Sequence, residues 1–138
     1  LLGAVHGAAD VLACVEELRR RGIERLGLVG HSFGGAVMVT VGATVPEVVT
    51  VVTLSTQTAG IQDAPRLAPR SLLLIHGLDD TLIHPSGGHR TAELVPGATL
   101  IEIEDMGHDR PEPLWPVIVG AIAQHAAAAT ASTMDVAS

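Results

Sequence analysis

Two kinds of hydrophobic pattern run along the chain, and together they predict a regular order of helices and strands. Continuous apolar runs, rich in valine, leucine and isoleucine, predict buried strands at 25–30, 48–55 and 71–77. The alternating segment 98–105 predicts a strand near an edge of the sheet. One-sided or proline-initiated patterns predict helices at 8–21, 34–45, 86–95 and 112–129, and residues 56–69 predict a loop or a short helical turn.

This alternation of helices with strands predicts an α/β fold with a mostly parallel sheet and helices on both of its faces. Phe33 and Trp115 are the only aromatic residues of the Phe, Trp and Tyr class, so the core must consist of aliphatic side chains. The 138 residues fit one domain over 1–129, followed by a flexible tail over 130–138. In a sheet of this kind, a site forms beyond the carboxyl ends of the strands.

Composition and charge exclude several classes of partner. The net charge is −7 and the longest basic run is the triplet at 19–21, which argues against nucleic acid. Cys14 is the only cysteine, so no disulfide can form within the chain, and we expect it to be a small buried residue of the first helix rather than a reactive thiol. No apolar stretch reaches the length of a membrane span, so we expect no membrane partner and a cytoplasmic protein.

The stretch from Gly30 to Gly34, with the sequence GHSFG, joins a predicted strand to an apolar segment that could be either helix or strand. A sharp turn here would crowd the backbone at Ser32, and the glycines on either side relieve that crowding. Such a turn presents the Ser32 hydroxyl at a helix N-terminus, where the free N–H of Phe33 can stabilise a developing negative charge. The turn therefore favours a helix over 34–45 and a nucleophilic role for Ser32.

A serine nucleophile needs a base, and the base needs an acid that orients it. The strand 71–77 is followed by Asp79 and Asp80, and the strand 98–105 is followed by His108. All of these groups come after strand ends, so we expect them to meet at one rim of the sheet. Their chain order is serine, aspartate, histidine, which is typical of a serine in this kind of turn.

On these motifs the sequence resembles the α/β-hydrolase family, over roughly residues 5–125. The motifs are GHSFG at 30–34, HGLDD at 76–80, and Gly107-His108. The resemblance is to small, lidless esterase-like and dienelactone-hydrolase-like members. It implies a Ser-His-Asp triad of Ser32, His108 and Asp80, with Asp80 favoured over Asp79 because the acid is the fifth residue of the HGxxD motif. It implies hydrolysis of an ester or related acyl bond of a small molecule, with no cofactor.

The sequence also departs from the family pattern. A complete member has eight strands with the serine turn after the fifth, and the first four strands are not matched here. No residue matches the second oxyanion donor of the family. We expect a fragment of a longer gene product; a minimal domain that forms a homodimer through the exposed edge of strand 25–30, and a decayed relative, are the competing interpretations. The alternative function is that of a non-catalytic module or an inactive fragment.

Three further residues are candidates for substrate contact. His31 precedes the nucleophile, and Thr56 and Gln57 follow the strand 48–55 on the same rim, together with Thr58. A structural role is the alternative for His31, and a plain loop role is the alternative for the residues after the strand.

The remaining histidines do not predict a metal site. His76, His84 and His89 are close in sequence but lack the helical spacing beside an acid that a metal-binding motif such as HExxH has. We expect His76 to pack or to bond the backbone, His84 and His89 to be exposed, and His6 and His125 to lie on the surface.

Overall fold

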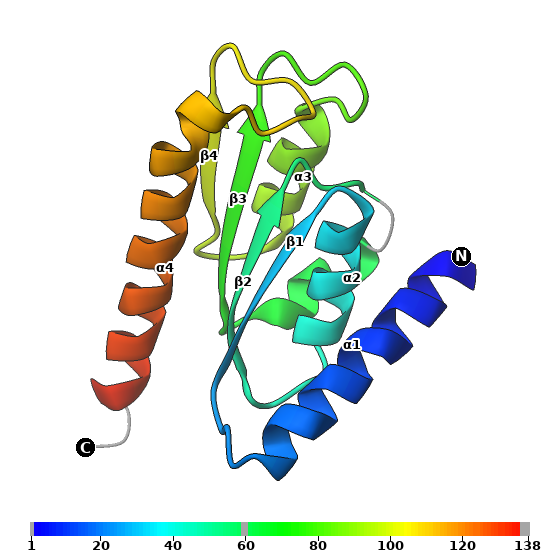
Figure 1. The fold of residues 1–138 in the computed structure, drawn as a ribbon, viewed down its shortest axis with the longest axis vertical. Coiled ribbons are helices and arrows are strands. Elements are labelled where there is room, and N and C mark those ends of the chain that lie inside the picture. Colours follow the sequence, from blue (N-terminus) through cyan, green and yellow to red (C-terminus); the bar gives the residue numbers. More distant parts are fainter. Residues whose placement is uncertain (1, 59–60, 136–138) are drawn as a thin grey trace.

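The structure is a computed structural model, and it describes residues 2–58 and 61–135 (Figure 1). Helices and strands alternate along the chain, with two short 3₁₀ helices between them. The elements are α1 (Leu2–Arg20), β1 (Leu26–His31), α2 (Phe33–Gly42), β2 (Val48–Leu54), η1 (Ile61–Leu67), β3 (Ser71–Gly77), α3 (Ser86–Leu94), β4 (Thr99–Ile103), η2 (Glu112–Leu114) and α4 (Trp115–Asp135).

The four strands form one parallel sheet in the order β1-β2-β3-β4. Because all strands run the same way, the loops that follow β1, β2, β3 and β4 lie at the same edge of the sheet (Figure 1). β4 lies at one side of the sheet, as its alternating sequence predicts. The predicted α/β class, with a parallel sheet between helices, is confirmed.

Two separate cores cover the two faces of the sheet. On one face, α1, α2, η1 and α3 pack over strand residues that include Val51 and Leu74. On the other face, α4 packs over Val52 and Ile75 through residues such as Ile118 (Figure 1). The β-branched and leucine-rich strands supply side chains to both faces, which is why their sequences are apolar throughout.

The N-terminal part is more exposed than its sequence predicts. β1 is an edge strand, in keeping with the exposed edge predicted for strand 25–30, but Val29 on it is 47% exposed, so the prediction of a buried strand is wrong there. α1 packs on α2 and buries Val15, but Leu12 remains exposed. Cys14 is also exposed, which corrects the prediction of a buried residue. An amphipathic sequence identifies the inner face of a helix, but not how much of that face a neighbouring helix covers.

The last helix differs from the sequence prediction in two ways. α4 continues to Asp135, whereas we expected a tail from residue 130; residues 136–138 lie outside the described part. The segment Glu112–Ser132 is also long and apolar enough to cross a membrane, by length and composition alone. The prediction that no stretch reaches that length is therefore wrong. Ile118 and Ala129 on the inner side of α4 are buried.

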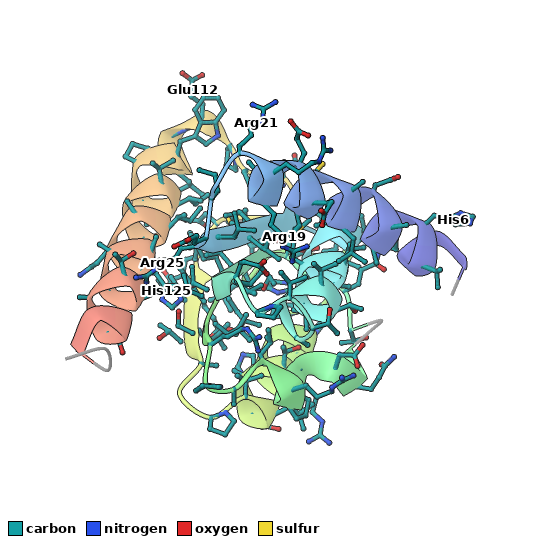
Figure 2. The ribbon with its side chains drawn as sticks, turned by 90° about the horizontal axis from the view of Figure 1, so that it is seen from below. His6, Arg19, Arg21, Arg25, Glu112 and His125 are labelled. Carbon is teal, nitrogen blue, oxygen red and sulfur yellow. The ribbon has the colours of Figure 1, made fainter. Side chains whose placement is uncertain are left out.

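His125 lies on the side of α4 that faces the sheet, where it shares a surface hollow with Leu73 and Ile101 (Figure 2). The residue is half-buried, and its Nε2 is buried with no hydrogen-bond partner among the described residues, so the prediction of a surface residue holds only in part. Burial lowers the pKa of His125, and a hydrogen bond to the backbone of Ser71 offsets this only in part.

We therefore expect His125 to make folding depend on pH. Below about pH 6.5, the ordinary histidine pKa, the unfolded chain binds a proton at this residue before the folded chain does. The contribution of neutral His125 to the free energy of unfolding is therefore complete above pH 6.5. It is lost as the pH falls towards the lower pKa of the folded state. Urea unfolding at pH 7.5 and 5.5 should show a smaller loss of stability for His125→Leu than for the wild type. The exposed His6 provides the control: His6→Leu should keep the wild-type loss, and equal losses in all three proteins would contradict the account.

Candidate active site

Ser32 occupies a strained turn between β1 and α2. Its backbone has φ 54° and ψ −123°, a conformation that non-glycine residues rarely adopt. The flanking glycines make this turn possible because side chains would not fit: a Cβ on Gly30 would collide with the carbonyl of Gly34, and one on Gly35 would lie 2.5 Å from Thr56 Oγ1. The small residues of the GHSFGG stretch therefore allow β1 and α2 to meet at Ser32.

Asp80 and Asp79 lie in the turn that follows β3, but only Asp80 is buried. Its side chain is fully buried, while Asp79 is exposed and its backbone N–H donates a hydrogen bond to the carbonyl of Met106. Gly77, at the end of β3, allows this close approach: a Cβ there would collide with the Met106 carbonyl. The loop that follows β4 thus packs directly against the turn that carries Asp80.

His108 bridges Ser32 and Asp80. Its Nε2 lies 3.1 Å from Ser32 Oγ, and its Nδ1 lies 2.9 Å from Asp80 Oδ2. A carboxylate accepts only, so Nδ1 carries a hydrogen and Nε2 is left to accept from the serine hydroxyl. The three side chains come from the ends of β1, β3 and β4, and the structure brings them into one continuous hydrogen-bonded chain.

The protonation state of Asp80 follows from its surroundings. Burial acts to raise the pKa of this carboxyl, but hydrogen bonds from the Ile83 N–H, the His108 ring and the Leu82 N–H act in the other direction. The balance holds the pKa of Asp80 below its ordinary value, so the group is ionised at neutral pH. The two backbone donors lie 2.8 Å (Ile83) and 3.0 Å (Leu82) from Oδ1. They are not evident from the sequence, because any residue type supplies a backbone N–H.

Phe33 is the first residue of α2, and its N–H therefore has no acceptor inside the helix. This N–H directly follows Ser32 in the chain and lies at the positive end of the helix dipole. It can donate to a negative oxygen that forms next to the serine.

The three candidate contact residues have different positions. His31 Nε2 donates to the backbone carbonyl of His108 at 3.0 Å, and the two rings lie 4.7 Å apart between centroids. Thr56 is 3% exposed, and its hydroxyl donates to the carbonyl of Ser32 at 3.4 Å, so it helps to hold the turn at Ser32. Gln57 is half-buried, and its N–H donates to the same Ser32 carbonyl at 3.4 Å.

The environment of His31 favours its neutral form. Burial is the main cause that lowers the pKa of His31, and the charges of Arg110 and His108 add to it, against the hydrogen bond to the His108 carbonyl. Because the His31 ring is neutral, it places no positive charge next to the His108 ring.

A hollow of about 360 Å³ lies between the loops that follow β2 and β3, and Ser32, Asp80 and His108 are not among its lining residues. Both loops lead into the site, since Gln57 bonds the Ser32 carbonyl and Ile83 bonds Asp80. Gln57 and Thr58 were named from the sequence, and the other residues that line the hollow were not. The lining residues are Gln57, Thr58, Leu82, Ile83, His84, Ser86 and Gly87.

No group of three histidine, cysteine, aspartate or glutamate side chains in the described part of the chain is placed to hold a metal ion. His84 and His89 are exposed; His84 lies 3.0 Å from Ser86 Oγ, and His89 lies 2.7 Å from Glu102.

Comparisons with solved structures place this architecture among the α/β-hydrolases. Est1E from Butyrivibrio proteoclasticus matches with a TM-score of 0.78 and 13% identity, over 90% of this chain and 69% of its own. A predicted CIB-like hydrolase from Thermoplasma acidophilum matches with a TM-score of 0.71 and 20% identity, over 86% of this chain and 59% of its own. A dienelactone hydrolase from Anabaena variabilis matches with a TM-score of 0.63 and 24% identity, over 72% of this chain and 46% of its own.

These likenesses establish the fold. The four-stranded parallel sheet and its helices match part of the α/β-hydrolase fold, as the sequence motifs predict. The chain spans about three fifths of the length of the Thermoplasma hydrolase. No protein-family model and no curated protein matches the sequence.

Proposed function

We propose that the chain carries the reaction centre of a serine hydrolase that cleaves an ester, or a related acyl bond, of a small molecule. The observation that supports this most strongly is the hydrogen-bonded chain from Ser32 Oγ through His108 to the buried, ionised Asp80. Solved structures of similar fold, among them a dienelactone hydrolase, are hydrolases, which is consistent with the proposal.

In the first half of the reaction, Ser32 Oγ attacks the carbonyl carbon of the substrate while its proton passes to His108 Nε2. The carbonyl π electrons move to the oxygen, and the Phe33 N–H stabilises the resulting negative charge. Asp80 accepts the Nδ1–H of the imidazolium and stabilises its positive charge. The bond to the alcohol oxygen then breaks, and that oxygen takes the proton from His108.

In the second half, a water molecule attacks the acyl group on Ser32 and gives one proton to His108 Nε2. The bond between the acyl carbon and Ser32 Oγ breaks, and the serine oxygen recovers its proton from His108. The carboxylic acid is released, so one water is consumed for each ester cleaved. All groups that move protons are side chains of this chain, and the scheme uses no metal or organic cofactor.

We place the acyl group of the substrate in the hollow between the loops that follow β2 and β3, and the lining of this hollow favours a short or polar group. Four of its seven lining residues are polar, namely Gln57, Thr58, His84 and Ser86. A long alkyl chain would displace water from these groups without replacing the hydrogen bonds that water makes.

Hydrolysis of p-nitrophenyl esters tests the proposal. The wild-type protein should hydrolyse p-nitrophenyl acetate and butyrate well above a heat-denatured blank. Its kcat/KM should be at least about tenfold higher for these short esters than for the decanoate, because a pocket that has to desolvate polar groups discriminates by such factors.

Two results would count against this account. Folded protein that hydrolyses none of the esters above the blank would support the alternative of a non-catalytic module. Hydrolysis in which the decanoate is the best substrate would contradict the acyl group inferred from the hollow.

A further inference from the structure

His76 is a buried polar residue that the proposed reaction does not use. It lies on β3, one residue before the end of the strand, and is 1% exposed. A buried imidazole is costly unless its nitrogens find partners, so its contacts indicate what it does.

The contacts of His76 lead to the turn that holds Asp80. His76 Nε2 lies 2.8 Å from the carbonyl oxygen of Ile83 and 3.4 Å from Asp80 Oδ2. Both oxygens accept only, so Nε2 carries a hydrogen and donates, mainly to the nearer Ile83 carbonyl.

Both backbone polar groups of Ile83 therefore form hydrogen bonds. Its carbonyl accepts from His76, while its N–H donates to Asp80 Oδ1 at 2.8 Å. The neighbouring Leu82 N–H donates to the same oxygen. Fixing the Ile83 carbonyl fixes the turn that presents both N–H groups, and these groups orient Asp80 towards His108.

The ring of His76 is itself held in place. Gly88 of α3 packs against it so closely that a Cβ at position 88 would lie 3.2 Å from His76 Nδ1. α3 lies beside β3 in the fold (Figure 1). The ring is thus enclosed between a strand and a helix, which makes it a rigid support for a loop.

We propose that His76 is a positioning residue for Asp80: its Nε2–H holds the 81–83 turn so that Asp80 faces His108. This role rests on the proposed hydrolysis. It is separate from the transfer of protons: none of the contacts described above joins His76 to Ser32 or His108, and His76 does not itself line the hollow, although it bonds Ile83, which does.

Two amide variants of His76 test the proposal, because they differ in reach. In His76→Gln the amide nitrogen reaches the place of Nε2, whereas in His76→Asn it stops one methylene short. We expect His76→Gln to stay within about threefold of the wild-type kcat for p-nitrophenyl acetate. His76→Asn should lose about 10- to 100-fold, mainly in kcat, since a displacement of about 1 Å in a reaction centre costs up to about 100-fold. The exposed His89 gives the control: His89→Asn should keep the wild-type kcat.

A double-mutant cycle with Asp80→Asn distinguishes positioning from general support of the fold. If His76 acts through Asp80, adding His76→Asn to Asp80→Asn should lower kcat by less than about twofold further. Losses that multiply in the double variant, or equal kcat values for His76→Gln and His76→Asn, would overturn the proposal. Wild-type protein that hydrolyses no ester would overturn the proposed function and this role together, whereas active wild-type protein with unaffected His76 variants would overturn this role alone.

The tautomer of His76 in the wild-type protein gives a second test that does not depend on whether the variants fold. Nitrogen–proton NMR correlation spectra should show a hydrogen on Nε2 that exchanges slowly with solvent. An Nδ1–H tautomer with a bare Nε2 would overturn the proposal.

Discussion

Replacing Ser32 with alanine should reduce ester hydrolysis by about 10⁶-fold in kcat, close to the level of the blank. Without the hydroxyl there is no covalent intermediate, and His108 has nothing to deprotonate in the first step. The backbone should be unaffected, since alanine bears the same Cβ as serine at φ 54°. The measurement is kcat for p-nitrophenyl acetate, with thermal unfolding to show that the variant is folded.

Ser55 offers a matched control for this experiment. It also has a positive φ, 45°, at the end of the neighbouring strand β2, and its buried hydroxyl has no hydrogen-bond partner among residues 2–58 and 61–135. Ser55→Ala should therefore keep the wild-type kcat. If Ser32→Ala kept its activity, or if both variants lost it equally, a nucleophilic role for Ser32 would have to be abandoned.

Replacing Asp80 with asparagine should lower kcat by about 10⁴-fold. Asparagine removes the negative charge that stabilises the His108 imidazolium, and its amide can donate to Nδ1, which would turn the ring to the wrong tautomer. The side chain is nearly the same size, so the Leu82 and Ile83 N–H groups can still bond its oxygen. Steady-state kinetics with p-nitrophenyl acetate measures the effect.

The adjacent Asp79 is the control for Asp80. It is exposed, and its fixed contact is a backbone hydrogen bond to Met106 that the substitution preserves. Asp79→Asn should change kcat by less than about threefold, in keeping with the small effect of most surface substitutions. Equal losses in the two variants, or a larger loss for Asp79→Asn, would show that the wrong carboxylate has been assigned.

The strands, and their alternation with helices along the chain, were predictable because hydrophobic runs are local features of the sequence. The runs at β2 and β3 are apolar throughout, which indicates strands covered on both faces and hence a parallel sheet. The turn at Ser32 was predictable because small residues surround the serine. The structure shows that the close contacts are at Gly30 and Gly35, whereas a Cβ on Gly34 would meet open space.

Exposure was harder to predict because it depends on neighbours that a local pattern does not reveal. Leu12 and Cys14 lie on α1, whose main contacts are with α2, and Val29 lies on an edge strand. His125 is the opposite case: a surface position was expected, but the residue is half-buried and lines a hollow between α4 and the sheet. In each case the residue type fits the element, while the burial follows from the packing of elements far apart in sequence.

For the candidate site, the sequence predicted the three reacting side chains better than the groups that hold them in position. Ser32, Asp80 and His108 carry distinctive chemistry after strand ends, so their residue types identified them. The groups that orient Asp80 are two backbone N–H groups and the ring of His76. That His76 packs or bonds the backbone was expected and is confirmed, but which carbonyl it bonds was not predictable from the sequence. Such supports become evident only once the turn after β3 has a definite geometry.

The central claim is that Ser32 is a nucleophile activated by His108, and covalent labelling tests it most directly. Folded wild-type protein would be treated with a fluorophosphonate, which loses fluoride when a serine oxygen attacks phosphorus, and then analysed by intact-mass and peptide-mapping mass spectrometry. We predict a single phosphonyl adduct, located on Ser32, that is absent from Ser32→Ala and forms far more slowly in His108→Gln. Folded protein that gains no adduct, or that gains one on another residue, would contradict the account.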